Sequence, residues 1–459
     1  MTTLARQLVR RLRSLADNEL PESVAQAARL HLTDAIGVGL AASRSTAGRA
    51  YRRLTDRVAR GGPCSIFGSA QSASAVDAAL VNGGLIHSLE FDDTHTGSIM
   101  HGSAVTAAAS LAAGQSLGAS GKAMLKAYVH GWEVLARIGL AAPGRFHAAG
   151  FQATSVAGTL ASALVCAELM RLDEDQTVHA LGIALSQSSG VMEFLSNGSS
   201  VKSLNPGWAA HGGVYAALLA DSGMTGPETS LDGRWGLFAQ FSDASDGVER
   251  LASAMTDLGE RWYLPDAALK FHPCCHYLHP FIEAAGRLIE QGADPARVTE
   301  IVCEVPVGAA PVICEPWSRA LAPETGHAAR WSLPITVAAR MLEGRVDLAT
   351  FETAASGPVR ALASKTRWVP LADARFPQQF EAVIHCSTDE GNRYSARVDD
   401  VDGNPSRPPV AERVLAKFRD NAARALPAEA VHALESACMS IDQGTDLAEL
   451  ARALGMVMA

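Results

Sequence analysis

Apolar residues recur every three or four positions through about the first 260 residues of the chain, which are also rich in alanine. This spacing puts apolar side chains on one face of an α-helix, whereas a half-buried strand alternates every second residue. Strand-like alternation is almost absent from this part of the chain. We therefore predict a helical region with helices over residues 22–42, 73–90, 103–117, 121–140, 153–171, 174–189 and 206–222. The expected helix starts are Ser120, Asp173, and Thr154 or Ser155.

The pattern changes after residue 262. TEIVCEVPV (299–307) alternates like a strand, and FEAVIHCSTDEGNRYSARVDD (380–400) is typical of two strands around a Glu-Gly turn. The remaining expected elements are helices at 279–291, 331–343 and 410–455 and a linker at 401–409.

These elements predict a mainly α fold with two domains. The first is a large all-helical domain of residues 1–262, completed by C-terminal helices in residues 407–459. The second is a smaller, inserted α+β domain of residues 263–406.

The charge balance argues against two classes of partner. The 39 basic and 48 acidic side chains give a net charge of −9, whereas general nucleic-acid and anionic-membrane binders need a cationic surface. We expect neither as a partner. A small anionic substrate remains compatible with the sequence, because a few buried cations can serve one site.

Cysteine usage and the N-terminus predict a cytoplasmic protein. The eight cysteines are dispersed, mostly in apolar stretches, and form no C-x-x-C motif, so we expect thiols that pack as small hydrophobes. The first 20 residues lack the apolar core of a signal peptide. Leu4, Leu8, Leu12 and Leu15 form one apolar stripe, which favours an ordinary first helix over a mitochondrial transit peptide.

Three nucleotide or hydrolase motifs are absent or misplaced. Residues 37–42 (GVGLAA) match G-x-G-x-x-A but lie within a helical pattern, whereas a dinucleotide site needs this motif between a strand and a helix. We interpret these glycines as a place of close helix packing. The chain contains neither a G-x4-G-K-[ST] motif nor a G-x-S-x-G motif.

One short segment, HSLEFDDTHTGSIMHGS (87–103), concentrates acidic and histidine side chains. They are His87, Glu90, Asp92, Asp93, His95 and His101. Three interpretations are open from spacing alone: a divalent metal site, a polar helix end that solvates its own backbone, and a metal-free acid–base site. If residues 87–94 are helical, His87, Glu90 and Thr94 share one face.

This segment and several that follow it resemble the MmgE/PrpD family. NGGLIHSLEFDDTHTGSIMHGSAV (82–105) is similar to the family signature N-G-x3-H-x-L-D-F-D-D-T-H followed by H-P-G-S. Further matching strings occur in the family's order, so the resemblance covers about residues 25–350. They are YVHGWEVLARIG, FQATSVAGTLASALVCAELMRLD, ALGIALSQSSG, VKSLNPGWAAHGGVYAALLADSGMTGP, LKFHPCCHYLHPFIEA and ARWSLPITVAARMLEGRV.

The resemblance implies a fold and a chemistry. Family members have a large helical domain and a smaller α+β domain, and are commonly homodimers. Their activities include 2-methylcitrate dehydratase, cis-aconitate decarboxylase and iminodisuccinate epimerase, which act on small polycarboxylates without a metal or organic cofactor. Making or breaking a bond beside a carboxylate needs a positioned base, and cations that stabilise the developing charge.

The resemblance also assigns residues. The implied catalytic set is Glu90, Thr94, His101, Lys202 and Lys270. In this set His101 is the general acid or base, Thr94 hydrogen-bonds the substrate, and the two lysines bind carboxylates. The implied substrate-binding residues are Asp93, Gln152, Lys202, Lys270, His276 and Trp317, and no metal ligand is expected.

The chain departs from the family pattern at several positions. Glu90 replaces an aspartate, and the spacing from Thr94 to His101 is one residue longer than in the decarboxylases. Gln152 and Asn205 replace two histidines with amides that do not shuttle protons at neutral pH. His147, five residues before Gln152, is a candidate substitute for a lost imidazole. Trp317 stands where the family has a tyrosine or its equivalent.

We therefore predict a cofactor-free lyase of the dehydratase type, acting beside a carboxylate of a small polycarboxylate through a carbanion-like or enolate-like intermediate. Decarboxylation and epimerisation begin with the same kind of intermediate and are alternatives. A second alternative is a non-catalytic homodimer that binds a small acid. A third is a metal-dependent hydratase that uses Asp92, Asp93, His95 and His101.

Overall fold

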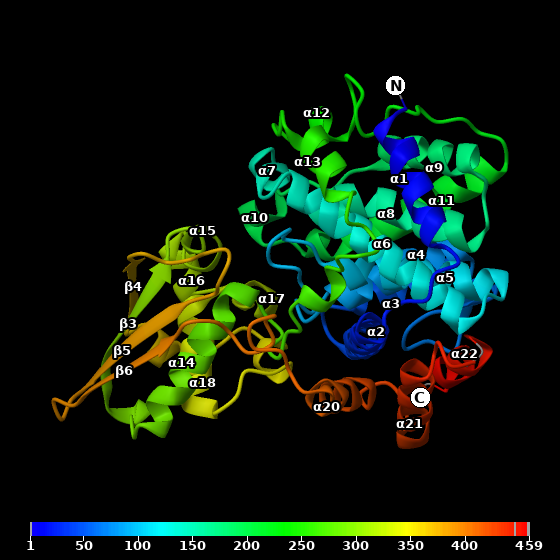
Figure 1. The fold of residues 1–459 in the computed structure, drawn as a ribbon. Helices are drawn as coiled ribbons and strands as arrows, with labels where there is room; N and C mark the ends of the chain where they lie inside the picture. Colours follow the sequence, from blue (N-terminus) through cyan, green and yellow to red (C-terminus); the bar gives the residue numbers. More distant parts are fainter. Residues whose placement is uncertain (1, 445–446, 457–459) are drawn as a thin grey trace. The chain divides into compact units, whose positions relative to one another are not determined.

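The computed structural model describes residues 2–444 and 447–456, and its mainly α architecture confirms the predicted fold class. The chain forms two compact units (Figure 1). The first unit contains Met1–Ser88, Asp92–Leu269 and Val410–Ala459. The second contains Lys270–Pro409 together with the three residues Leu89–Phe91.

The first unit is helical apart from the two-residue strands β1 (Cys64–Ser65) and β2 (Ser72–Ala73) and its loops. Its longer helices are α1 (Leu4–Leu15), α2 (Glu22–Arg44), α3 (Arg49–Val58), α4 (Ala75–His87), α5 (Gly102–Leu117), α6 (Gly121–Ala141), α8 (Ala153–Leu169), α9 (Glu174–Gln187), α11 (Leu204–Asp221), α13 (Gly247–Ala254), α20 (Ala411–Ala422), α21 (Ala428–Met439) and α22 (Leu447–Gly455). Its short helical segments are α7 (Arg145–Ala148), α10 (Phe194–Asn197), η1 (Ser200–Ser203), α12 (Leu237–Phe241) and η2 (Leu264–Asp266).

Helices α4, α5, α8 and α11 form the centre of this unit. Nearly every side chain of α5 from Gly102 to Gly114 is buried, so this helix is surrounded by protein on all sides. Small residues let the central helices approach closely. A methyl group added at Gly83 in α4 would lie only 2.8 Å from the Cα of Gly207 in α11.

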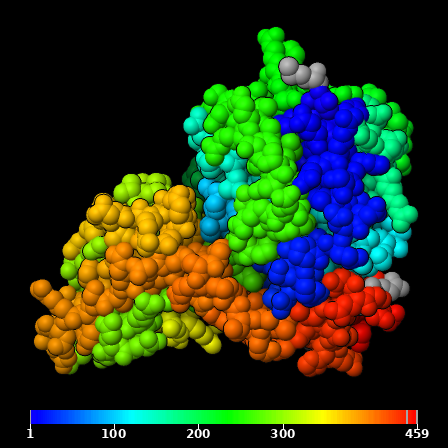
Figure 2. All heavy atoms as spheres, viewed as in Figure 1, coloured from blue at the N-terminus to red at the C-terminus, as the bar shows by residue number. Residues whose placement is uncertain are grey.

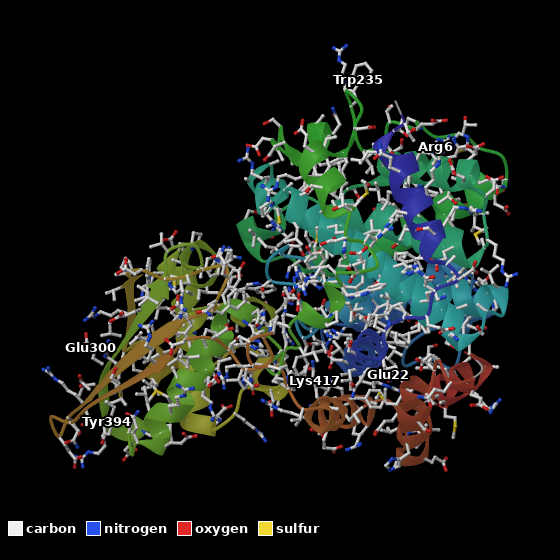
Figure 3. All side chains as sticks on the ribbon, viewed as in Figure 1. Arg6, Glu22, Trp235, Glu300, Tyr394 and Lys417 are labelled. Atoms are coloured by element: carbon white, nitrogen blue, oxygen red, sulfur yellow. The ribbon has the colours of Figure 1, made fainter. Side chains whose placement is uncertain are left out.

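Two peripheral helices pack through buried apolar residues and also form ion pairs with neighbouring segments. Helix α1 crosses the surface (blue in Figure 2), where Arg6 forms ion pairs with Glu174 and Glu228. Helix α20 packs on α2, and Lys417 extends from α20 to a buried ion pair with Asp34 of α2, 2.8 Å away (Figure 3).

The glycines at 37 and 39 lie inside α2, which confirms that the G-x-G-x-x-A string is a place of close packing. A methyl group at Gly37 would lie 2.9 Å from the ring of Phe418, and one at Gly39 would lie 2.5 Å from the ring of Phe67. The motif does not follow a strand, so it lacks the context of a dinucleotide site.

The second unit contains a four-stranded sheet in the order β4 (Thr366–Leu371), β3 (Val298–Pro306), β5 (Ala382–Thr388), β6 (Arg393–Val398). Strand β3 is parallel to β4 and antiparallel to β5. Helix α14 (His279–Glu290) packs on β5 and β6, and α18 (Leu333–Glu343) packs on α14 (Figure 1). The other helical segments are η3 (His276–Leu278), η4 (Pro295–Arg297), α15 (Ala310–Ile313), α16 (Trp317–Leu321), α17 (Gly326–Ala329), η5 (Ala349–Phe351) and α19 (Gly357–Ala363).

Local predictions differ from the structure at helix ends. Ser120 and Asp173 cap their helices as predicted, each accepting a hydrogen bond from a backbone N–H of the first turn. Neither Thr154 nor Ser155 is a cap, because α8 begins earlier, with Gln152 as its N-cap residue. Strand β4 and helix α3 were not predicted. All eight cysteines are free and buried.

No helix in the described ranges combines the length and apolar character needed to cross a bilayer.

Candidate active site

The segment that follows α4 is irregular, so the condition of a helix over 87–94 is not met, and the helix predicted over 73–90 ends earlier. Helix α4 ends at His87, and Glu90 has a positive φ of 53°. Thr94 then pairs with Ala268 through two backbone hydrogen bonds, and His95 pairs with Met100 in the same way. His87, Glu90 and Thr94 therefore do not share a helical face.

His101 occupies the N-cap position of α5, where its backbone N–H donates to the Thr154 hydroxyl. Its ring Nδ1 lies 3.1 Å from the backbone oxygen of Asp93 and 3.1 Å from Oγ1 of Thr94. A carbonyl oxygen only accepts, so Nδ1 carries a proton and donates it. The neutral ring then has its lone pair on Nε2. The His101 side chain is 14% exposed.

Asp92 brings a second imidazole close to His101. Its Oδ2 lies 2.8 Å from Nδ1 of His87 and 3.6 Å from Nδ1 of His101. The two rings meet edge to face with their centroids 4.7 Å apart. Both Asp92 and His87 are fully buried. The cluster thus couples the predicted acid–base histidine to a carboxylate that the resemblance did not assign to the site.

The carboxylate of Asp93 is bonded to the helices next to His101. It accepts hydrogen bonds from the backbone N–H and the hydroxyl of Ser103 in the first turn of α5, where a negative charge suits the helix N-terminus. His31 of α2 contacts the same carboxylate, with its Nδ1 2.8 Å from Oδ2. Burial and the nearby Asp93 charge raise the pKa of Tyr128, which bonds the Ser103 hydroxyl. His31 and Tyr128 had no distinguishing signal in the sequence.

The four residues of the metal-dependent alternative do not form one ligand set. His95 bonds the Ser98 hydroxyl, and burial together with the charge of Arg261 lowers its pKa to about 4. Asp93 is engaged with Ser103 and His31 as described. Among the described residues, the group whose ligand atoms lie close enough to hold a metal ion is His87, Asp92 and His101.

The two amides that replace family histidines contact each other. The Asn205 side-chain NH2 donates to Oε1 of Gln152 over 2.7 Å, and both side chains are buried. Nε2 of Gln152 lies 3.5 Å from Nε2 of His87. The imidazole beside Gln152 is therefore His87, which lies 65 residues earlier in the chain.

Lys202 lies in η1, directly before α11, and is half-buried. Its charge and the burial of His147 together lower the pKa of that histidine to about 4. His147 is thus a neutral imidazole near a cation at neutral pH.

The second unit holds Glu90, Lys270 and a third residue that sequence reasoning missed, Arg330. Lys270 Nζ donates to the backbone oxygen of Glu90 over 3.3 Å. Arg330 donates to the backbone oxygens of Leu89, over 2.7 Å, and Pro273. Both cations are buried, and burial lowers the pKa of Arg330 to about 10. These bonds hold the backbone of 89–91 in the conformation that requires a positive φ at Glu90.

His276 and Trp317 also lie in the second unit. His276 is buried beside His279 and Phe380. The centroid of its ring lies 4.8 Å from the centroid of each of these two rings. Neither ring nitrogen has a hydrogen-bond partner among the described residues, and burial lowers the pKa of His276 well below its usual range. Trp317 begins α16 and packs, half-buried, on the apolar core of this unit.

Comparison with known proteins matches both parts of the chain. The MmgE/PrpD N-terminal domain model matches residues 6–248, and the MmgE/PrpD C-terminal domain model matches residues 272–443. The cis-aconitate decarboxylase-like protein oryM of Aspergillus oryzae is 28% identical over 95% of this chain and 94% of its own length. The cis-aconitate decarboxylase of Aspergillus terreus is 25% identical over 95% of this chain and 93% of its own. The mouse cis-aconitate decarboxylase is 26% identical over 96% of this chain and 91% of its own.

Proposed function

Because the chain belongs to the MmgE/PrpD family, we propose that it is a lyase that acts beside a carboxylate of a small polycarboxylate substrate. The observation that carries this proposal is the geometry of His101. Its Nδ1 is held by the Asp93 carbonyl and Thr94, so that Nε2 is the nitrogen that exchanges protons. Asp92 stabilises the protonated ring, because its carboxylate lies 3.6 Å away.

Decarboxylation is the first reaction to test, because the similar proteins carry that name. In this reaction the bond between one carboxyl carbon of the substrate and the neighbouring substrate carbon breaks. CO2 leaves, and the electron pair stays on that neighbouring carbon. The protonated His101 then delivers its Nε2 proton to that carbon. In dehydration, the second candidate, neutral His101 removes a proton from the carbon beside a carboxylate and becomes protonated. The C–H electron pair then forms the double bond as the C–O bond of the neighbouring carbon breaks, and the leaving hydroxide takes a proton from His101 or from solvent and departs as water.

We propose that Lys202 and Lys270 bind substrate carboxylates and that the reaction needs no metal or organic cofactor. A carbanion beside a carboxylate delocalises charge onto the carboxylate oxygens, and an ammonium group stabilises that charge. His276 and Trp317 are proposed as further substrate contacts, as the family pattern assigns them.

The experiment that tests this proposal is proton NMR of the purified, chelator-treated protein with a panel of carboxylates in D2O. The panel contains citrate, methylcitrate, cis-aconitate, tartrates and aminosuccinate derivatives. We expect a decarboxylated or vinylic product, or deuterium at an α carbon, from at least one member. Loss of activity on chelation that added zinc restores would contradict the cofactor-free reaction. Binding without exchange or product would favour the non-catalytic alternative.

We also propose that the protein is a homodimer and that α11 forms its interface. One face of this helix is exposed although the opposite face packs on α4 and α8. The exposed stripe alternates steps of four and three residues, as in helices that pack along a shared seam. It consists of the exposed Trp208, Tyr215 and Leu218 and the half-buried Leu204 and His211.

The composition of this stripe suits a second copy of the same chain. In a two-fold interface each surface meets itself, so a charge near the axis would face a like charge. Helix α11 has no charged side chain before Asp221. Trp208 and Tyr215 are 42% and 45% exposed, and each ring contacts that of His211 between them, so they form one exposed aromatic patch.

Light scattering at several concentrations tests this interface. We expect a dimer for the parent protein and a monomer for the double variant Tyr215→Glu/Leu218→Glu, with Val307→Glu, an exposed apolar residue of the second unit, as the matched control. Under air oxidation, His211→Cys should form a disulfide-linked dimer, because position 211 is at the centre of the stripe, where the two copies meet. The native cysteines are all buried and do not compete, and Glu300→Cys should form no such link (Figure 3). A monomeric parent protein, or a dimer that survives the double variant, would overturn this interface.

A further inference from the structure

Two buried amides lie at one end of a hydrogen-bonded series that runs through His87 to Asp92, whose carboxylate lies 3.6 Å from Nδ1 of His101. Gln152 is the N-cap residue of α8, and Asn205 is the second residue of α11. Their side chains are 3% and 7% exposed. The Ser155 hydroxyl also donates to the backbone oxygen of Asn205 over 3.1 Å. This bond holds the start of α11 against α8.

The bond between these amides determines which way Gln152 points. Oε1 of Gln152 accepts from the NH2 of Asn205 over 2.7 Å, so the NH2 of Gln152 is the group that faces His87. An amide NH2 can only donate. Nε2 of His87, 3.5 Å away, is therefore the unprotonated nitrogen of that ring, and the ring proton lies on Nδ1, 2.8 Å from Asp92.

We infer that Gln152 and Asn205 are positioning residues that, together with Asp92, hold His87 as its Nδ1–H tautomer, so that Asp92 remains an acceptor toward His87 and keeps its charge 3.6 Å from Nδ1 of His101. The donors then run in one direction, from Asn205 through Gln152 and His87 to Asp92. A reversed Gln152 would turn its oxygen toward His87 and favour a proton on Nε2. The His87 lone pair on Nδ1 would then face the Asp92 carboxylate, and that contact would become repulsive.

This arrangement gives the two amides a role that differs from binding substrate. Neither amide gains or loses a proton near neutral pH. Proton exchange in this cluster is therefore confined to the imidazoles of His87 and His101. Only the expected effect of the amides on kcat rests on the proposed function. The tautomer of His87 is a property of the resting protein.

The sharpest variant is Asn205→Asp, which keeps the shape of the side chain and replaces its donor with an acceptor. Above neutral pH the new carboxylate attracts the NH2 of Gln152 and reverses the amide. Gln152→Leu removes the donor to His87 and puts no acceptor in its place. Gln152→His restores a donor at the same position. Gln187→Leu is the matched control, because Gln187 is a half-buried amide of α9 whose side chain, among the described residues, hydrogen-bonds a backbone oxygen of its own helix and no other group.

Nitrogen-15 NMR of histidine-labelled protein reads the tautomer, with the His87 signals assigned from their loss in His87→Gln. At mildly alkaline pH we expect the Nδ1–H form in the parent protein and in Gln187→Leu. We expect an Nε2–H population in Asn205→Asp and a smaller one in Gln152→Leu, because Asp92 still favours a proton on Nδ1 in both variants. An Nε2–H form in the parent protein, or an unchanged tautomer in Asn205→Asp, would overturn the inference whether or not a substrate is known.

Kinetics on the substrate found in the carboxylate panel provide the second readout. We expect kcat to fall by at least about tenfold in Asn205→Asp and Gln152→Leu with little change in KM, because acid–base catalysis contributes on the order of 100-fold or more. Gln152→His should recover part of kcat. A change confined to KM would instead assign the amides to substrate binding and contradict the positioning role.

Discussion

His101 is the residue on which the proposed chemistry depends most directly. Its Nδ1 is bonded to the Asp93 carbonyl, and its backbone N–H is bonded to Thr154, so the ring orientation is set by contacts on two sides. We expect His101→Ala to lower kcat by at least about 100-fold, the usual contribution of a general acid or base. Circular dichroism should show an unchanged fold.

The matched control for this prediction is His432→Ala, since His432 is exposed on α21. It should leave turnover and the fold unchanged. Near-normal turnover of His101→Ala would remove His101 from the mechanism.

Lys202 and Lys270 are predicted to act mainly in substrate binding. Losing one ammonium–carboxylate contact removes roughly 1.5–3 kcal/mol, which corresponds to about tenfold or more in affinity. We therefore expect Lys202→Met and Lys270→Met each to raise KM more than they lower kcat. Steady-state kinetics and substrate titration measure both effects.

Lys270 also donates to the Glu90 backbone, so its variant is expected to lose some stability as well. Lys122→Met, at a lysine 51% exposed and paired with Glu19, is the control for removal of a surface charge. Unchanged substrate affinity in both the Lys202 and the Lys270 variants would refute their assignment as carboxylate ligands.

At the scale of elements, one buried ion pair contributes to the attachment of α20 to α2, beside the packing of Phe418 on Gly37. The side chains of Lys417 and Asp34 are 6% and 1% exposed, and their charged atoms lie 2.8 Å apart. Removing one partner leaves a buried, unpaired charge, which typically costs about 3–5 kcal/mol. We expect Lys417→Met to lower the free energy of unfolding by that amount in urea denaturation.

The double variant Lys417→Met/Asp34→Leu should recover most of the loss, because it leaves no unpaired charge. The exposed Lys122–Glu19 pair supplies the comparison, and its disruption should cost at most about 1 kcal/mol. Equal losses in the single and double variants would mean that the charge pairing is not the source of the stability.

At the scale of the whole molecule, buried neutral histidines are expected to make stability depend on pH. Burial lowers the pKa of His95 and His147 to about 4, and places those of His276 and His279 well below their usual value of 6.5. Each folded-state pKa lies below the unfolded value, so the unfolded chain binds more protons in acid. Their contribution is fully present above about pH 6.5 and is lost as the pH falls toward about 4.

We expect His95 and His147 each to remove about 2 kcal/mol from the free energy of unfolding between pH 7 and pH 5. Urea denaturation across this range measures the slope of the unfolding free energy against pH. His147→Gln should reduce this slope by the equivalent of up to about one bound proton. The exposed His432→Gln should leave the slope unchanged. Stability that stays constant or rises on acidification would contradict this prediction.

Local sequence was sufficient for most of the helical framework. Helical periodicity is a property of neighbouring residues, so it located α6 and α9 together with their capping residues Ser120 and Asp173. It did not predict β4, because a strand's partners lie elsewhere in the chain: Thr366 pairs with Ile301, 65 residues earlier. It also placed the end of α4 three residues too late, because the positive φ of Glu90 is held by bonds from distant cations.

The sequence by itself determined the fold class, the ordered family motifs and the histidine at position 101, since these are matters of residue type and spacing along the chain. Only the tertiary structure decided which groups surround that histidine. It brought His87 and Asp92 beside His101, put His31 on Asp93, and joined Gln152 to Asn205. The physical reason is that a hydrogen bond depends on distance and direction between side chains. Those follow from the packing of helices far apart in sequence, which no local pattern encodes.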